Sequence, residues 1–424
     1  MNLTGSIPVM LETAATVVLL LLFSEALLGP LLADETDPES SVVLRLMWPP
    51  LYAVIFLFAL PRWIPAINLA VRMPLTVLLI GWVGLSVFWS IDQGVTLRRF
   101  IAIAMTTVFG LHLAVRYNWR EFLTLLGIVW LILAIGSIVF SLAVPALGVE
   151  QEEHVGAWKG LWFQKNTLGG HMARASFMFG ILIITERQHR HIWSLGFVLS
   201  LGLVLMSTSK TSLLGVLIGL GLVAIGALMR RGPISSLSMI WCLVAFGGGF
   251  GFLATTQPEL FFALLGRDAT LTGRTEIWDA LGQLIQQRPI FGYGFGAFWS
   301  EGSAQAAYVK DLTEWEVPTA HNGWLETWLA VGIVGVSTFV VIFFNTLVRA
   351  VISAMRGWHG LFALGSLLQF FLFSMSESII LNQNAIVWVT FVAVSASLVQ
   401  QKFGRDPKKL LGPRRSRDFL LVNR

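Results

Sequence analysis

Charged residues are scarce in this chain of 424 residues, because Asp, Glu, Lys and Arg make up only 12% of it. This share is about half that of an ordinary soluble protein. Hydrophobic residues make up 55% of the chain, and its mean hydropathy is +0.74. A soluble domain of this length could not cover its surface with so few charges. The composition excludes secreted, cytosolic and disordered proteins, and it predicts an all-α polytopic membrane protein.

Cysteine is nearly absent as well. Cys242 is the single cysteine, so the chain cannot form an internal disulfide, and its place in an apolar run suits a small hydrophobic side chain. The histidines show none of the spacings with cysteine or carboxylates that mark a zinc site. From these absences we expect neither a structural metal nor a bound cofactor.

Basic charge gathers at the C-terminal end. The formal net charge of the chain is +5, and residues 401–424 alone hold eight basic and two acidic side chains. A short basic tail after the last apolar segment is typical of a cytoplasmic tail that lies on the membrane surface. We therefore expect no nucleic-acid partner, and we divide the chain into a transmembrane domain, 1–400, and a basic cytoplasmic tail, 401–424.

Twelve apolar segments are candidates for membrane-spanning helices, which need about 20 mostly apolar residues each. They are centred on 9–32, 42–60, 74–91, 100–115, 122–144, 167–184, 193–207, 212–229, 235–255, 322–348, 358–373 and 385–399.

The loops between these segments alternate in charge, as expected when arginine and lysine stay on the cytoplasmic side. Two acidic stretches, 34–39 and 150–153, fall in loops on the opposite side. The pattern predicts that both termini are cytoplasmic. The arginines that define the cytoplasmic loops are Arg62, Arg72, Arg116, Arg120, Arg187, Arg190, Arg230, Arg231, Arg349 and Arg356.

One connection is much longer than the others and spans residues 256–320, between the ninth and tenth segments. Long ordered loops in compact proteins are usually functional. The charge alternation places this loop on the periplasmic or outer side. Within it, residues 276–288 predict an amphipathic helix that ends before Pro289 and lies on the outer membrane face or on the helix bundle. Its apolar face consists of Ile277, Trp278, Leu281, Leu284 and Ile285.

Two basic residues on the outer side suit an anionic ligand. Lys210 lies in the hydroxyl-rich turn 207–212, where it could hold a phosphate or extend to lipid headgroups. Arg274 follows a glycine at the start of the amphipathic helix, and a guanidinium beside free backbone N–H groups suits a pyrophosphate. The alternative for Arg274 is a salt bridge to Glu276 or Asp279.

His321 stands where the long loop re-enters the membrane, directly before Asn322. A helix N-terminus favours neutral imidazole, which can act as a general base toward a bound hydroxyl. The alternative is a hydrogen-bonded interfacial histidine. Glu25 and Arg174 lie inside predicted spanning segments, where placing an ionisable group costs free energy. We interpret each as a member of a structural ion pair whose partner the sequence does not identify.

Six motifs, in this order, resemble the O-antigen ligase and polymerase family of membrane glycosyltransferases, most closely its exopolysaccharide-polymerase branch. The resemblance extends from about Arg98 to Phe344 and implies a GT-C-like arrangement of helices. The motifs are residues 156–166, 207–212, 273–278, 289–298, 321–326 and 332–335.

The resemblance implies an enzyme of the bacterial inner membrane that acts on the periplasmic face. Such an enzyme transfers a glycan from undecaprenyl pyrophosphate to a sugar hydroxyl, with inversion and without a metal or cofactor. The family's essential histidine corresponds to His321 and its loop arginine to Arg274. Lys210 stands where the ligases usually have arginine, which favours the polymerase branch because lysine lacks a bidentate fork. Arg98 and Arg99 fall where the family often has a basic residue.

Lys165, Asn166 and Asn322 complete the expected substrate-binding residues. The expected partners are a lipid-linked glycan donor, an acceptor that is a lipid-linked repeat unit or a lipopolysaccharide core, membrane lipids and a chain-length regulator. Three functions remain open: a polysaccharide polymerase, a ligase that transfers a finished glycan to a lipopolysaccharide core or a protein, and a flippase of lipid-linked glycans. The sequence lacks the paired half-chain repeats of many transporters, which argues against the third.

Overall fold

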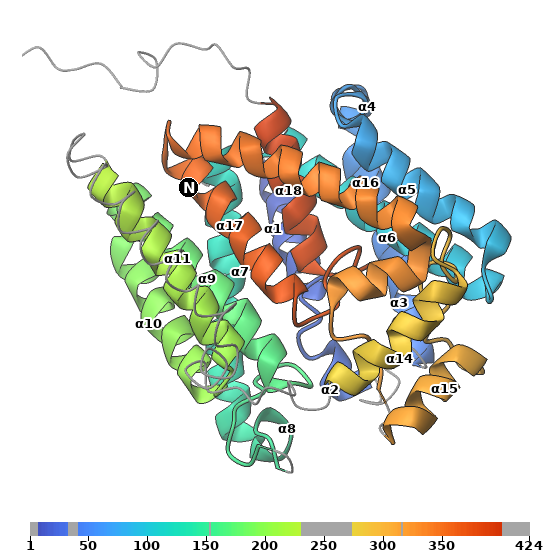
Figure 1. Ribbon diagram of the computed structural model, residues 1–424. Helices are drawn as coiled ribbons and strands as arrows, with labels where there is room; N and C mark the ends of the chain where they lie inside the picture. The colour runs from blue at the N-terminus through green and yellow to red at the C-terminus, as the bar shows by residue number, and fades with distance from the viewer. Residues whose placement is uncertain (1–6, 33–40, 152–153, 230–273, 315–316, 401–424) are drawn as a thin grey trace, which may run out of the picture.

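The computed structural model describes residues 7–32, 41–151, 154–229, 274–314 and 317–400. Within these ranges the chain forms helices and no strands, with one isolated bridge between Val149 and Trp158. Seven of the described helices are long and apolar enough to cross a membrane, and several shorter apolar helices accompany them. The prediction of an all-α, multi-pass membrane protein is confirmed (Figure 1).

Eleven of the twelve predicted spanning segments coincide with helices, and the twelfth, 235–255, lies outside the described residues. The long helices, apart from the one over Gly323–Ala354, are continuous over the width of a membrane, because each contains an uninterrupted apolar run. The eleven helices are α1 (Ile7–Leu22), α3 (Val42–Ala59), α5 (Pro74–Leu85), α6 (Gln93–Arg116), α7 (Trp119–Ala143), α9 (Lys165–Thr185), α10 (Arg190–Met206), α11 (Lys210–Met229), α16 (Gly323–Ala354), α17 (Trp358–Ser374) and α18 (Ile386–Gln400).

The first predicted segment is shorter than the sequence indicated. Helix α1 ends at Leu22, and the chain then turns through Glu25 and Leu27, both with positive φ, before the short helix α2 (Leu28–Leu32). Backbone contacts hold this turn, because Leu27 N–H donates to the carbonyl of Leu161 at 2.8 Å. Glu25 therefore lies in a turn at the helix end and not within a spanning helix.

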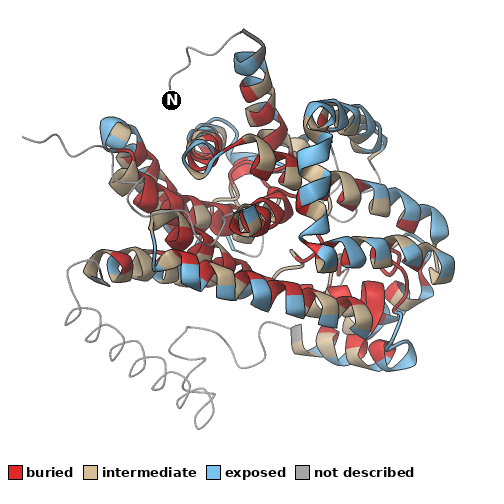
Figure 2. Cartoon of the chain, turned by 90° about the horizontal axis from the view of Figure 1, so that it is seen from above, coloured by how far each residue is buried: buried red, intermediate tan, exposed pale blue. Residues whose placement is uncertain are grey.

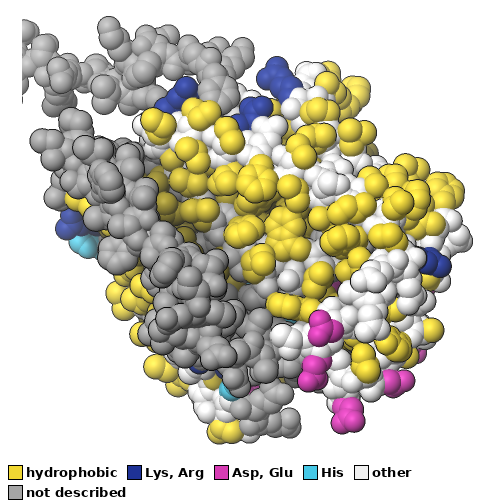
Figure 3. All heavy atoms as spheres, viewed as in Figure 1, with side chains coloured by type: hydrophobic (Ala, Val, Ile, Leu, Met, Phe, Trp, Pro, Cys, Tyr) yellow, Lys and Arg dark blue, Asp and Glu magenta, His cyan; other side chains and the backbone are white. Residues whose placement is uncertain are grey.

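Arginines from several helices meet at one end of the bundle. The carboxylate of Glu12 accepts hydrogen bonds from Arg62 at 2.7 Å and from Arg116 at 2.9 Å, and Arg120 pairs with Glu186. The charge alternation placed these arginines on one side of the membrane, and we call this end the arginine end. Figure 3 shows several Lys and Arg side chains at the upper edge of a broad hydrophobic band, further basic side chains at its two sides, and Asp and Glu below it.

The core of the bundle is built around α9, which packs against α7, α10, α11 and α17. Figure 2 shows buried residues concentrated toward the middle of the bundle and exposed residues on the outer faces of the surrounding helices. Large side chains such as Phe109, Phe177, Phe339 and Trp388 are fully buried there. Helix α3 lies at the periphery and packs mainly on α6, so most of its apolar surface remains available to lipid.

The described part of the long loop forms a small core of its own on top of α16. It contains α14 (Arg274–Gln287) and α15 (Ala304–Thr313), which pack on each other and on the start of α16. The apolar face of α14 points into this core, so the predicted amphipathic helix lies on the bundle. The buried members of the cluster include Ile277, Leu281, Leu284, Tyr293, Phe298, Val309 and Leu329.

Candidate functional site

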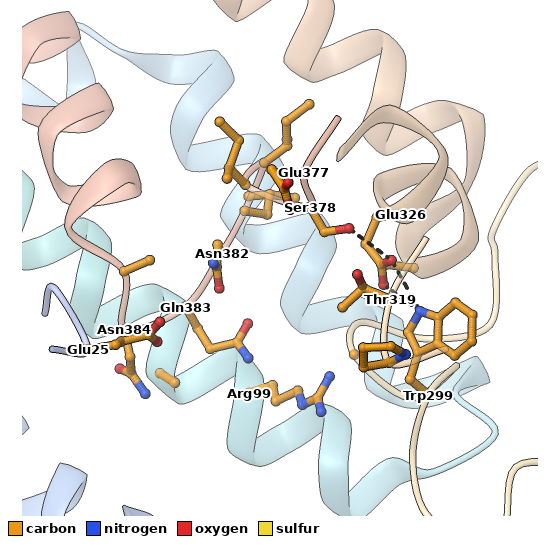
Figure 4. A pocket seen from close by; sticks show the side chains of 18 of the residues that line it. Glu25, Arg99, Trp299, Thr319, Glu326, Glu377, Ser378, Asn382, Gln383 and Asn384 are labelled. Atoms are coloured by element: carbon orange, nitrogen blue, oxygen red, sulfur yellow. Dashed lines mark hydrogen bonds between the residues drawn. The ribbon is translucent and has the colours of Figure 1, made fainter. Parts of the chain in front are cut away.

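A cavity of about 1220 Å³ opens at the end of the bundle opposite the arginine end. It is lined by the α1–α2 turn, the first turns of α3, α6 and α9, the loop segments 295–304 and 317–321, and the α17–α18 connection. Its polar lining in Figure 4 comes mostly from segments between helices. We call this end of the molecule the cavity end.

His321 lines the cavity in a strained backbone conformation. Its φ is 45°, in the left-handed region that a residue with a side chain rarely adopts, and only 8% of its surface is exposed. The preceding residue is fixed because Ala320 N–H donates to the Glu326 carboxylate at 2.9 Å. Such conformations persist where the surroundings enforce them, and they concentrate at functional sites.

Asn322 begins the helix that follows. Its side-chain oxygen accepts hydrogen bonds from Trp324 N–H at 2.9 Å and Leu325 N–H at 3.2 Å, which is the usual arrangement of an N-cap. Asn322 is not among the cavity-lining residues. The structure thus gives it a local role, which is to fix the start of α16 next to His321.

Glu326 joins three segments around His321, and sequence reasoning gave it no role. Its carboxylate accepts from Trp299 Nε1 at 2.9 and 3.1 Å, from Ala320 N–H and from Ser378 Oγ at 3.4 Å (Figure 4). The donors belong to the 295–304 segment, the His321 turn and the α17–α18 connection. One half-buried carboxylate therefore holds the cavity wall together.

Glu377 stands next to His321 and was also missed. Its Oε2 lies 3.8 Å from His321 Nδ1. Arg174, on α9, attracts the Glu377 carboxylate electrostatically, and its guanidinium lies 4.4 Å from the centre of the Phe373 ring. The intramembrane arginine that had no identified partner thus lines the same cavity as Glu377. A signal was present in the sequence, because residues 374–384 are polar between two apolar helices.

Arg99 is held at the same wall by close contact with a glycine. At Gly296, where φ is 71°, an added Cβ would lie 2.1 Å from Arg99 Cδ. The arginine side chain therefore lies directly against this backbone, and its charge attracts the Glu326 carboxylate. Arg99 is thereby brought to the side of the cavity that contains Trp299 and Thr319 (Figure 4).

Replacing Gly296 by alanine is expected to destabilise the protein by about 1–3 kcal/mol, the usual cost of an enforced backbone conformation. The methyl group would collide with Arg99, and alanine disfavours a φ of 71°. Thermal unfolding of the purified protein in detergent measures the effect. Gly282→Ala is the matched control, since a Cβ there meets nothing within 4 Å. Equal unfolding temperatures for Gly296→Ala and the unmodified protein would show that Arg99 does not pack against Gly296.

The glycine-rich motif 289–298 has a structural role. Helix α16 is broken at Gly332, where φ is 68° and ψ is −174°. The motif fills the break: Tyr293 N–H donates to the carbonyl of Leu329 at 2.7 Å, and Ile333 N–H donates to the carbonyl of Pro289 at 2.9 Å. These contacts attach the outer loop to the bundle and so define one wall of the cavity.

The sequence-predicted site residues divide into two groups. His321, Arg98, Arg99 and Asn166 line the cavity. Two lysines stand beyond its lining, at the helix starts next to Asn166: Lys165 begins α9, with its Nζ 3.4 Å from Thr208 Oγ1, and the exposed Lys210 begins α11.

Arg274 is the first residue of α14, but its side chain lies outside the described part of the structure. In the same described part, no group of three or more His, Cys, Asp or Glu residues is close enough to hold a metal ion.

Comparison with known proteins gives two matches. Residues 195–340 match the family model described as O-Antigen ligase, and this range contains Lys210, Arg274 and His321. The chain is also 26% identical over 287 residues to "Exopolysaccharide production protein ExoQ" of Rhizobium meliloti (strain 1021). That alignment covers 62% of this chain and 63% of the relative, which is less than two thirds of either protein.

The helical membrane architecture, the order of the motifs and the two matches agree with one another. The resemblance inferred from the motifs is confirmed. The chain is thus similar to the O-antigen ligase family over residues 195–340 and to an exopolysaccharide production protein over 62% of its length.

Proposed function

We propose that this protein joins undecaprenyl-pyrophosphate-linked oligosaccharide repeat units into a surface or secreted polysaccharide, at the periplasmic face of the bacterial inner membrane. The observation that carries the proposal is the cavity lined by His321, Glu377 and four arginines, at the end opposite the arginine end. The name of the ExoQ relative supports an exopolysaccharide as the product. The charge alternation supports a periplasmic cavity and cytoplasmic termini.

His321 acts on the acceptor. Its imidazole takes the proton of the acceptor hydroxyl as that oxygen attacks the anomeric carbon of the donor sugar. The nearby Glu377 carboxylate, 3.8 Å from Nδ1, stabilises the imidazolium that forms. Attack from the face opposite the leaving group inverts the anomeric centre.

The leaving group departs as lipid pyrophosphate and takes the electron pair of the broken C–O bond. Fixed cations stabilise the charge that develops on it, without a metal ion. Arg99 lies on the cavity wall beside His321, and we assign the same task to Arg274 and Lys210 from the family resemblance. Asn166, at the mouth of α9, contacts the glycan, with Lys165 next to it. A chain-length regulator is the protein partner that the family resemblance implies.

Glu377→Gln is expected to lower kcat by about 10- to 100-fold with little change in KM. The neutral amide cannot stabilise the imidazolium, and the loss is felt in the transition state. Initial rates with purified protein and a lipid-linked repeat unit measure the effect. Asp311→Asn, on the exposed surface of α15, is the control and should leave kcat unchanged. A rise in KM at constant kcat would assign Glu377 to substrate binding instead.

The three functions are distinguished by the glycans of cells that lack the gene. A polymerase predicts that single lipid-linked repeat units accumulate on the periplasmic side while long polymer disappears, and that the gene restores a ladder of lengths. A ligase predicts that finished lipid-linked polymer accumulates instead. Accumulation of single units on the cytoplasmic side would support the flippase and contradict the proposal.

A further inference from the structure

The cavity extends to one side between α3 and α6, and we call this part the α3–α6 wing. The lining residues on each helix follow helical spacing, so each helix presents one continuous stripe to the same space. The stripes consist of Leu44, Arg45, Trp48, Pro49 and Tyr52 on α3, and of Gly94, Leu97, Arg98, Ile101 and Ala102 on α6.

Arg45 and Arg98 lie at similar depths in the membrane. Arg45 precedes Arg62 by 17 residues and Arg98 precedes Arg116 by 18, so each pair is separated by about 25–27 Å along its helix. Arg62 and Arg116 meet at Glu12 at the arginine end. Because the hydrocarbon layer is about 30 Å thick, both Arg45 and Arg98 lie at the opposite membrane interface.

Below the two arginines the wing is apolar. Trp48 stacks on Tyr52, with ring centres 6.1 Å apart, and meets the edge of Phe23 at 5.3 Å. On the facing helix, Leu97 beside Arg98 and Ile101 one turn beneath it are 50% and 46% exposed. An amphiphile with an anionic head at the arginines and an apolar chain beneath it fits this polarity. Glu25 also lines this region, and together with the two arginines it leaves a net positive charge.

The wing is separate from the basic residues at α9 and α11. Lys165 and Lys210 begin these helices, which pack on each other and, with α7, α10 and α17, form the far side of the bundle from α3 (Figure 1). Helix α3 packs on α6 instead. Asn166 of α9 and Arg98 of α6 line the same cavity as His321. A ligand at α9 and a ligand in the wing could therefore both extend to the wall that contains His321.

We propose that the α3–α6 wing binds the phosphate head and isoprenoid chain of a second lipid-linked substrate, with Arg45 and Arg98 at the phosphates. The inference rests on the proposed function: a polymerase must hold two lipid-linked glycans at once, so it needs two anionic head sites that converge on one histidine. The basic residues at α9 and α11 belong to the first site, and the α3–α6 wing is the second.

The test uses the purified full chain in phosphatidylethanolamine vesicles and a sugar-free polyprenyl pyrophosphate with a photoreactive group on its chain. After irradiation, peptide mapping should place label on residues 44–52 and 94–102. The Arg45→Ala/Arg98→Ala double variant should reduce this label at least about tenfold. Arg349→Ala, at a half-buried arginine on α16 near the arginine end, should not change it. Lys210→Ala should also leave it unchanged, because its site is separate.

Three results would overturn the second site. They are absence of label from the wing, full wing label in the double variant, or loss of wing label in Lys210→Ala. Equal competition by phosphatidylglycerol and by unlabelled polyprenyl pyrophosphate would identify an ordinary lipid site and overturn the proposal as well. The probe carries no sugar, so labelling does not depend on transfer. If the protein is labelled in the wing but makes no polymer, the second site is supported and the proposed function is contradicted.

Discussion

Cells whose only copy carries His321→Ala are expected to lose long polymer and to accumulate single lipid-linked repeat units. A positioned general base contributes about 100- to 10,000-fold to the rate, so the remaining activity should be too low to build a chain. The strained turn, the Glu377 carboxylate at 3.8 Å and the position in the cavity wall all favour this role for His321. Gel separation of surface and secreted glycans measures the length distribution.

His191→Ala is the matched control, since His191 is exposed near the start of α10, at the arginine end. It should give polymer of normal length and amount. Protein levels in the membrane must be equal in both strains, which immunoblotting checks. Normal polymer in the His321→Ala cells would contradict the assigned mechanism, and the cations would then have to act without a base.

Glu326→Ala is expected to cause the largest loss of stability, about 3 kcal/mol, together with loss of polymer. Its carboxylate accepts hydrogen bonds from Trp299, Ala320 and Ser378, and alanine would leave these donors without an acceptor inside the protein. Because Ala320 precedes His321, the catalytic turn should loosen at the same time. The unfolding temperature of the purified protein in detergent measures the first effect.

Two further variants separate the causes. Asp279→Ala, on the exposed face of α14, removes a carboxylate of the same outer loop and should leave stability unchanged. Glu326→Gln retains one acceptor oxygen and should fall between alanine and the unmodified protein. If Glu326→Ala unfolds at the same temperature as the unmodified protein, the carboxylate does not hold the three segments together.

The helices could be predicted from the sequence because a membrane-spanning helix satisfies its backbone hydrogen bonds within its own segment, and that segment is visible as one apolar run. The alternation of basic residues between successive loops predicted that Arg62, Arg116 and Arg120 lie on one side of the membrane. Their ion pairs with Glu12 and Glu186 at one end of the bundle agree with this grouping. The first segment was predicted too long. Its apolar residues continue past Leu22, and the turn that ends the helix is fixed by Leu161, a residue far along the chain.

The cavity wall was only partly predictable. His321 stood out because a loop histidine at a membrane re-entry is unusual. Glu377 and Glu326 were missed. Their roles depend on contacts between segments more than fifty residues apart in the sequence, and local residue spacing does not show such contacts. Arg45 was overlooked within a spanning segment. The proposed role of Asn322 in substrate binding remains a prediction, although its side chain caps a helix.

The central claim is that this chain alone joins lipid-linked repeat units at the His321 cavity. The most direct test is the product length distribution from purified protein in vesicles supplied with one substrate, the undecaprenyl-pyrophosphate-linked repeat unit, in the presence of a metal chelator. We expect a ladder of lengths from the unmodified protein and unreacted single units from His321→Ala. Transfer of only one unit, or the same ladder from both proteins, would contradict it.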